Sequence, residues 1–226
     1  MNIWVLGIDP GVSGALSVIK PNGEIAYLAK PPTVQVLVNK SLRRKLNLPI
    51  FAATVRELQE SSSKEDARLV AYVEEVSSMP TDGGIQGFAF GRNFGQIEGI
   101  LAALDVPYTL VRPKEWKAYM VAKQVSLPKL SKTEGSKFNR KQKDRLGRAV
   151  AKARKVASVE AATRLFPRHA EVFSKPEGDG AAEASLLAEW GRRRESSSTM
   201  EKPKQEKITV DPSLVLGLTE AVSDSE

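Results

Sequence analysis

Short apolar runs separated by turn residues dominate the first thirty positions of the chain. Residues 3–8, 15–19 and 25–28 are apolar, and Pro-, Gly- and Asn-containing segments separate them. Three short strands joined by tight turns are typical of an antiparallel meander. Because residues 3–8 are apolar at nearly every position, we expect this strand to be buried on both faces in the centre of the sheet.

Apolar spacing predicts further elements along the rest of the chain. After a polar connection, Leu48, Phe51, Val55 and Leu58 recur at helical spacing and predict a helix over residues 48–60. Two more strands are expected, at residues 69–76 and 106–111. Further helices are expected up to about residue 104, from a start at residues 114–117, and at residues 150–166 and 178–193. The chain therefore alternates between strand and helix patterns after its N-terminal meander.

A Gly-rich segment and the C-terminal segment lack such patterns. Residues 83–96 carry repeated glycines between aromatic and polar residues, which predicts a flexible loop before the next helix. From Glu195 onward Ser, Lys, Glu and Pro dominate, apart from an apolar island at residues 214–218. We therefore expect one domain over residues 1–193 and a disordered or loosely docked tail over residues 194–226.

The residue types present restrict the chemistry to oxygen ligands. The chain has no Cys and a single His, His169, which excludes disulfides, thiolate zinc sites, cysteine nucleophiles and His-rich metal sites. It contains no run of eighteen uncharged apolar residues, and a strand pattern begins within three residues of the N-terminus. We expect a soluble chain without a membrane span, signal peptide or transit peptide.

Positive charge is concentrated in one stretch. The net charge is +7, with a pI near 9.5. Residues 112–155 hold fifteen Lys and Arg against three acidic residues, a net charge of +12 that leaves −5 for the rest. Such a stretch is typical of a protein that binds a phosphate backbone and releases its counterions. The alternative is a solvated charged loop.

Four acidic residues follow or begin predicted elements in a way that suggests one shared site. Asp9 ends the first apolar run and Glu74 ends another, while Asp179 and Glu183 lie one helical turn apart on one face. Carboxylates that share a site repel each other, which raises their proton affinity unless a hard cation lies between them. The pattern indicates a Mg²⁺ site, and the basic surroundings indicate a polyanionic substrate.

Each of these acids also has a structural interpretation. Glu74 is alternatively a strand-end charge that points to water. Because successive strand residues point to opposite faces, only one of Glu74 and Glu75 faces the pocket, and we take Glu74. Asp179 is alternatively an N-cap or first-turn acid that the helix dipole stabilises.

Four segments together resemble the RuvC-type Holliday junction resolvases. Residues 3–19 (IWVLGIDPGVSGALSVI) resemble the family's opening strand, its catalytic Asp and the Pro-Gly that follows. Residues 73–76 (VEEV), 111–117 (VRPKEWK) and 179–184 (DGAAEA) resemble its second-strand glutamate, lysine-bearing and last acidic segments, in that order. Bacterial members space the last two acids three apart. The interval of four here, with the Gly-rich aromatic segment, is more similar to the plant and algal plastid branch.

This resemblance implies an α/β, RNase H-like fold, a five-stranded mixed sheet flanked by helices. It also implies that Asp9, Glu74, Asp179 and Glu183 are catalytic and hold two Mg²⁺ ions, for which Mn²⁺ would substitute, during phosphodiester cleavage that leaves 5′ phosphates. Paired symmetric cuts in a four-way DNA junction require a twofold homodimer, with residues 96–104 as its expected surface. No membrane partner is expected.

DNA contacts are expected from a basic set and from the Gly-rich segment. The basic residues that would contact phosphates without reading sequence are Lys114, Lys117, Arg148, Arg154 and Lys155. In the Gly-rich segment, the aromatic and polar side chains that would stack on or bond to unpaired bases are Phe88, Phe90, Phe94, Arg92, Asn93 and Gln96. Phe residues near a helix start are alternatively core residues, and we expect at least one to be so.

Two other functional classes fit the same residues. The first is an RNase H-like nuclease that acts on other branched DNA or on RNA–DNA hybrids, and the second is a noncatalytic junction-binding protein. The resemblance to the plastid branch implies a chloroplast nucleoid location for a chain whose transit peptide is absent. Otherwise a bacterial or phage cytoplasm is expected, with a role in DNA recombination and repair.

Overall fold

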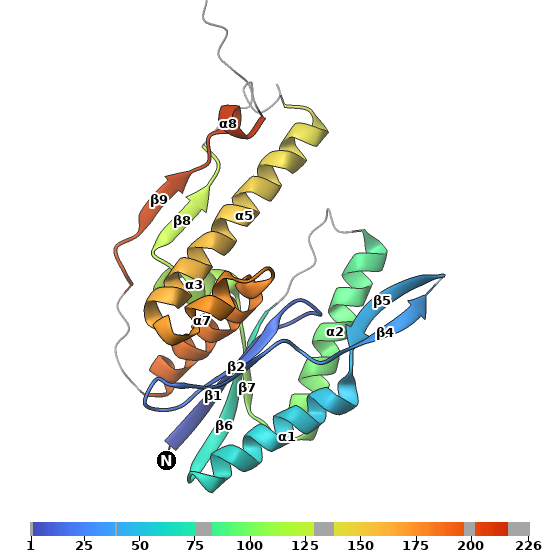
Figure 1. Ribbon diagram of the computed structural model, residues 1–226, viewed down its shortest axis with the longest axis vertical. Helices are drawn as coiled ribbons and strands as arrows, with labels where there is room; N and C mark the ends of the chain where they lie inside the picture. The colour runs from blue at the N-terminus through green and yellow to red at the C-terminus, as the bar shows by residue number, and fades with distance from the viewer. Residues whose placement is uncertain (1, 39, 76–82, 129–137, 197–201, 217–226) are drawn as a thin grey trace, which may run out of the picture.

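A mixed β-sheet forms the centre of the protein. The computed structural model describes residues 2–38, 40–75, 83–128, 138–196 and 202–216. Within these residues the central sheet has five strands in the order β3-β2-β1-β6-β7 (Figure 1). Their bounds are β1 (Asn2–Asp9), β2 (Ala15–Ile19), β3 (Ile25–Ala29), β6 (Ala67–Glu74) and β7 (Tyr108–Val111).

The pairing of these strands confirms the expected fold class. Strands β1, β2 and β3 form the antiparallel meander, and β6 and β7 continue the sheet parallel to β1. β1 is central, as its two-sided apolar pattern predicts, because Val5, Leu6 and Ile8 are all buried. This meander followed by parallel strands is the α/β, RNase H-like arrangement that the resemblance implies.

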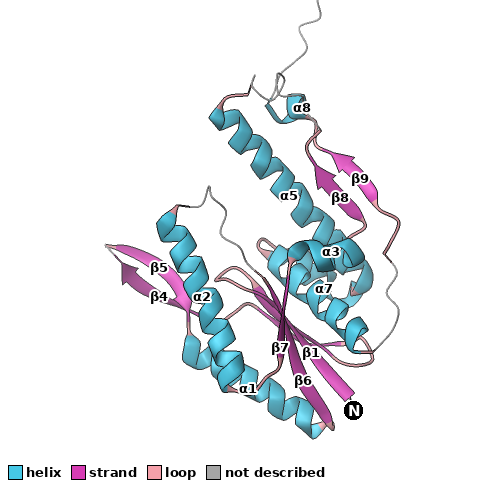
Figure 2. Cartoon of the chain, turned by 180° about the vertical axis from the view of Figure 1, so that it is seen from behind, coloured by secondary structure: helices cyan, strands magenta, loops and turns pink. Residues whose placement is uncertain are grey.

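Helices cover both faces of the sheet (Figure 2). Val5, on one face, belongs to a core cluster with residues of α3 (Pro113–Met120), α5 (Arg140–Leu165) and α7 (Gly178–Glu195). Trp4, Leu6 and Ile8, on the other face, pack with residues of α1 (Leu48–Lys64) and α2 (Gly84–Ala103). The short elements η1 (Pro167–His169) and α6 (Ala170–Ser174) connect α5 to α7. No helix in the described residues has the length and apolar character needed to cross a bilayer.

The expected polar connection before α1 is wrong, because this segment folds into a hairpin. Strands β4 (Thr33–Val38) and β5 (Ser41–Leu46) pair in antiparallel fashion as a sheet of their own. Figure 1 shows this hairpin projecting from the body of the protein beside α2. Cationic side chains on β5 give it the composition of a loop, which hides the strand pattern.

The expected flexible loop over residues 83–96 is also wrong. Helix α2 begins at Gly84 and includes the Gly-rich segment, although a Gly within a helix costs up to about 1 kcal/mol relative to Ala. Tertiary packing outweighs this cost, because Ile97 and Leu101 are buried and Phe94 packs against the same core cluster.

Part of the expected tail has regular structure. Strand β9 (Glu206–Thr209) pairs in parallel with β8 (Lys123–Ser126), and α8 (Pro212–Leu216) follows it. Ile208 and Val210 pack against the core cluster that contains α5, which explains why this segment docks instead of remaining disordered. Residues 197–201 and 217–226 of the expected tail lie outside the described residues.

Candidate active site

The four predicted acids are brought to one edge of the sheet. Asp9 and Glu74 end the neighbouring parallel strands β1 and β6, in which Ile8 is paired with Val73. Asp179 lies in the first turn of α7 and Glu183 lies one turn later. The electrostatic field of Glu74, Glu183 and Asp179 reaches Asp9, so segments far apart in the sequence contribute to one acidic cluster.

Glycines allow the start of α7 to approach β1 closely. A Cβ added at Gly180 would lie 2.8 Å from the Ser13 carbonyl oxygen and 3.1 Å from Asp9 Oδ2. A Cβ added at Gly7 would lie 2.2 Å from the Ala184 carbonyl oxygen. Neither space admits a side chain without movement, so small residues on both elements determine how near Asp179 comes to Asp9.

The environment of Asp9 disfavours its charged form. Burial raises the pKa of this carboxyl group well above its usual value, and the neighbouring carboxylates, with Glu74 first, raise it further. Lys117 acts in the opposite direction and lowers the pKa. Such a group is stabilised as a carboxylate when additional positive charge is brought close to it.

Glu74 is the member of its pair that belongs to the cluster. Its Oε2 accepts a hydrogen bond of 2.9 Å from the buried indole Nε1 of Trp116. Burial raises the pKa of Glu74, whereas Lys117 and the Trp116 hydrogen bond lower it. Glu75 lies in an ion pair with Arg112, at 3.2 Å. The choice of Glu74 over Glu75 therefore agrees with the geometry, and Trp116 is a partner that the sequence did not predict.

Glu183 and Asp179 are paired with lysines that were expected to contact phosphates. Lys117 Nζ lies 2.7 Å from Glu183 Oε1, which also accepts a 2.9 Å hydrogen bond from Ser158 Oγ. Lys155 Nζ lies 2.6 Å from Asp179 Oδ2, and this hydrogen bond raises the pKa of Lys155. These two lysines supply positive charge inside the acidic cluster, a role that the sequence did not predict.

The donor set suits a hard cation. All four acids supply carboxylate oxygens, the ligands that Mg²⁺ prefers, and the raised pKa of Asp9 is what a nearby cation would reverse. In this arrangement no group of three or more acidic or His side chains among the described residues converges on one ion position. Lys155 is 60% exposed, so it can leave Asp179 by a change of side-chain rotamer. The donor types therefore suit a cation, and its binding would require Lys155 to leave Asp179 and the carboxylates to move together.

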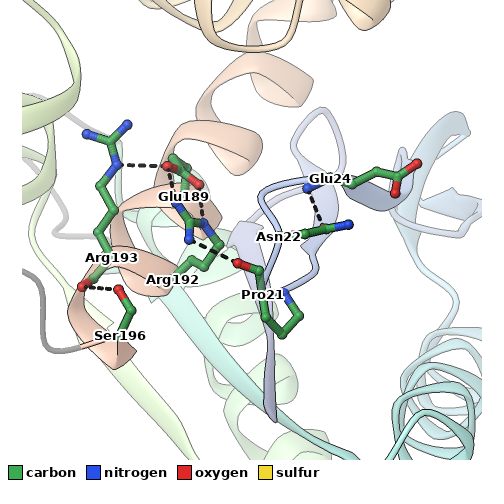
Figure 3. A network of polar contacts seen from close by, with 7 residues as sticks. All are labelled: Pro21, Asn22, Glu24, Glu189, Arg192, Arg193 and Ser196. Carbon is green, nitrogen blue, oxygen red and sulfur yellow. Dashed lines mark hydrogen bonds and ion pairs between the residues drawn. The ribbon is translucent and has the colours of Figure 1, made fainter.

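The far end of α7 is anchored by a separate polar network (Figure 3). Glu189 is buried, and its carboxylate accepts hydrogen bonds of 2.7 Å from Nε of both Arg192 and Arg193. Arg192 also donates to the carbonyl oxygen of Pro21 in the β2–β3 turn, at 3.2 Å. The network holds α7 against the meander at the end opposite to Asp179.

The aromatic residues expected to contact DNA lie on α2 with different exposures. Phe88 is 73% exposed and Phe90 is 39% exposed, whereas Phe94 is partly buried against the core. A Cβ added at Gly11, in the turn after Asp9, would lie 3.8 Å from a ring carbon of Phe90. Phe90 therefore lies beside the acidic edge, and Phe94 is the structural member of the set.

The remaining predicted DNA contacts are exposed or half-buried residues of α2, α3 and α5. The polar side chains of α2 comprise exposed Arg92 and half-buried Asn93 and Gln96. Lys114 on α3 and Arg148 on α5 are exposed. Arg154 donates from Nε to the Val125 carbonyl oxygen at 3.0 Å, so it also attaches α5 to β8. Residues 129–137 of the basic stretch lie outside the described residues.

Comparison with known proteins gives similarity at the level of solved structures. No protein family model matches the chain, and no curated protein matches it. RuvC of T. thermophilus in complex with a Holliday junction substrate is 12% identical, with 88% of this chain and 98% of that chain covered and a TM-score of 0.46. Another Thermus thermophilus RuvC structure is 12% identical, with 87% and 98% covered and a TM-score of 0.39. The function of this chain is therefore inferred from its own residues.

Proposed function

We propose that the protein is a metal-dependent endonuclease that resolves four-way DNA junctions. The observation that carries this proposal is the cluster formed by Asp9, Glu74, Asp179 and Glu183, which come from three separate segments and lie at one edge of the sheet. A basic helix, α5, runs beside the cluster and contributes Lys155 to it. A polyanion can thus be held by basic side chains while the acids hold cations next to a phosphodiester.

The four acids would hold two Mg²⁺ ions, or Mn²⁺ in their place. When bound, these ions lower the pKa of an attacking water and stabilise charge on the leaving 3′ oxygen, which leaves a 5′ phosphate. Trp116 orients Glu74 by its 2.9 Å hydrogen bond, and Ser158 orients Glu183. Lys117 and Lys155 balance the negative charge of the cluster, and each can exchange its carboxylate partner for a substrate phosphate.

A homodimer would supply the two sites that paired cuts require. On α2, Gly99 within the expected surface and Gly91 and Gly95 before it are exposed at intervals of four, and a Cβ added at any of them would meet no described atom within 4 Å beyond the helix's own backbone and the adjacent residues. A second helix can therefore approach this face closely. Light scattering of the full chain tests this arrangement, because a monomer at micromolar concentration and on junction DNA contradicts it.

The exposed Phe88 and Phe90 on α2, of which Phe90 lies beside the acidic site, would contact the unpaired bases of branched DNA. Aromatic rings stack on unpaired bases without a requirement for sequence.

The resemblance to the plastid branch further supports a role in recombination and segregation of chloroplast DNA. A fluorescent fusion of the complete gene product tests the compartment, and a signal outside the plastid contradicts it.

The proposal is tested with a synthetic four-way junction, Mg²⁺ and the full chain, with plain duplex and RNA–DNA hybrid as competitors. Paired nicks at symmetric positions, lost in Asp9→Asn with binding intact, are the expected result. Equal cutting of duplex or hybrid would instead favour a general RNase H-like nuclease. Junction binding without nicks in any divalent ion would show a noncatalytic junction-binding protein.

A further inference from the structure

The β4–β5 hairpin combines positive charge with exposed apolar side chains. Residues 33–46 contain no acidic residue. They include four cationic residues, Lys40, Arg43, Arg44 and Lys45, all exposed except the half-buried Lys45. Leu37 and Leu42 are paired directly across the two strands next to the turn, and each is 68% exposed. An isolated two-stranded hairpin has little stability of its own, so this exposed surface suggests a partner.

Cationic side chains lie on both faces of the hairpin. Successive strand residues alternate between faces, so Arg43 and Lys45 share one face of the hairpin. The Leu37–Leu42 pair lies on the opposite face, which it shares with Arg44, the partner of Glu177. A partner that offers negative charge along two walls and apolar surface between them fits this arrangement. Double-stranded DNA has this character, because phosphates line a groove and base edges, including thymine methyl groups, form its floor.

The base of the hairpin is fastened to the acidic edge of the sheet. Strand β3 ends at Ala29, which pairs with Leu16, next to the Asp9–Ala15 pair. Glu177, two residues before Asp179, accepts ion pairs from Lys30 Nζ at 2.6 Å and from Arg44 Nη2 at 3.7 Å. Lys30 lowers the pKa of Glu177, whose backbone is in the left-handed region at φ 62°. The hairpin therefore leaves the body where the acids lie.

We propose that the β4–β5 hairpin is a DNA-binding arm that enters a groove of the substrate next to the acidic site. Lys40, Arg43 and Lys45 contact phosphates, and the Leu37–Leu42 pair rests against bases. A groove about 12 Å wide admits a two-stranded β-ribbon. Apolar side chains such as Leu can wedge between base steps and unstack them. The proposal rests on the proposed function for the identity of the substrate.

Salt dependence of junction binding tests the charged face. Binding of the full chain is measured by fluorescence anisotropy in Ca²⁺, as a function of salt concentration, for wild type and for Lys40→Gln/Arg43→Gln/Lys45→Gln. Each lost phosphate contact reduces the slope of log K against log salt by about 0.9, so we expect a slope shallower by roughly 2 to 3. Affinity at low salt should fall about tenfold or more.

A matched variant controls for the loss of charge alone. Arg56, Lys64 and Arg68 are exposed cations on α1 and at the start of β6, away from the acidic edge. Arg56→Gln/Lys64→Gln/Arg68→Gln removes the same charge and should keep the wild-type slope. An unchanged slope in the hairpin variant, or an equal loss in both variants, would overturn the proposal.

Base contact is tested with 2-aminopurine placed at the junction centre, whose fluorescence rises when the base unstacks. Wild type should raise the fluorescence, and Leu37→Ser/Leu42→Ser should lose most of that rise while it keeps the salt slope. Light scattering follows the same variant. A change from dimer to monomer without any change in fluorescence would assign the leucine pair to a contact between two copies and overturn its role in DNA binding.

The outcomes separate this proposal from the proposed function. If wild type binds the junction through the hairpin but does not nick it, the nuclease is wrong and the DNA-binding arm stands. If wild type nicks the junction and the hairpin variants bind as it does, the arm is wrong and the nuclease stands. If wild type does not bind DNA, both are wrong.

Discussion

The indole N–H of Trp116 donates to Oε2 of Glu74 at 2.9 Å inside the core. Trp116→Phe keeps most of the ring and removes the donor. Hydrogen bonds to charged groups contribute about 1.5–3 kcal/mol, so cleavage should slow roughly 10- to 100-fold. Because this bond lowers the pKa of Glu74, its loss raises that pKa. The acidic limb of the single-turnover rate against pH should therefore move to higher pH.

Trp190→Phe is the matched control for this substitution. Trp190 is buried on α7, and its Nε1 has no hydrogen-bond partner among the described residues. Its replacement removes an indole N–H that donates to no carboxylate, so the single-turnover rate should depend on pH as in wild type. An identical change of profile in both variants would show that Trp116 acts through packing and not through Glu74.

Asp9 should lower the stability of the metal-free protein at neutral pH. Burial raises the pKa of Asp9 in the folded protein above its value in the unfolded chain. As pH rises between these two pKa values, Asp9 is ionised in the unfolded chain but still protonated in the folded protein. The free energy of unfolding therefore falls across this pH range. Asp9→Asn cannot ionise, so it avoids this fall in the free energy of unfolding and should have a higher Tm than wild type in EDTA at pH 7. A gain of about 1 kcal/mol corresponds to roughly 2–4 °C for a domain of this size.

Thermal unfolding across pH, with and without divalent cation, checks this expectation. The gain in Asp9→Asn should disappear below about pH 4, where both states of the wild type are protonated. Mg²⁺ or Mn²⁺ should raise the Tm of wild type more than that of the variant, because binding to the folded state alone stabilises it. A variant less stable than wild type at every pH would instead make Asp9 a structural residue.

The central strands and the four acids were predictable because their signals are local. A strand buried on both faces is apolar at every position, and an acid at its end stands out, as Asp9 does. Which of Glu74 and Glu75 joins the cluster depends on strand alternation, which the pattern alone leaves open. Their partners Trp116 and Ser158 come from α3 and α5, so only the tertiary structure reveals them.

The elements that were missed are those in which local preference and tertiary packing disagree. The glycines of α2 favour a loop, and the buried Ile97 and Leu101 turn the segment into a helix. Helix α5 begins well before the predicted residue 150, because exposed charges hide its period. Asn139 and Gln142 form a capping box there, the one local signal of its start.

Gly180→Ala should separate the acids with little unfolding. The added Cβ would lie 2.8 Å from the Ser13 carbonyl oxygen and 3.1 Å from Asp9 Oδ2, so the first turn of α7 must move away from β1. Cleavage and affinity for Mn²⁺ should both fall, by about tenfold for a displacement that costs about 1.4 kcal/mol. Titration of Mn²⁺ in the absence of DNA measures the affinity directly.

A glycine with free space around it controls for the helix propensity of alanine. A Cβ added at Gly147, in α5, would meet no described atom within 4 Å beyond the helix's own backbone and the adjacent residues. Gly147→Ala should therefore stabilise the protein by roughly 0.5–1 kcal/mol and leave Mn²⁺ affinity unchanged. Unchanged Mn²⁺ affinity in Gly180→Ala as well would contradict a role of Asp179 and Asp9 in one cation site.

Lys155 should compete with a divalent cation for Asp179. Its ammonium lies 2.6 Å from Asp179 Oδ2 and is 60% exposed, so the pair is screened and modest in energy. Lys155→Gln removes the competing charge and should tighten Mn²⁺ binding roughly two- to fivefold. The same variant should lose one phosphate contact, which makes the salt slope of junction binding shallower by about 0.9. Weaker Mn²⁺ binding in Lys155→Gln would show that the ammonium holds the acidic cluster together and does not block it.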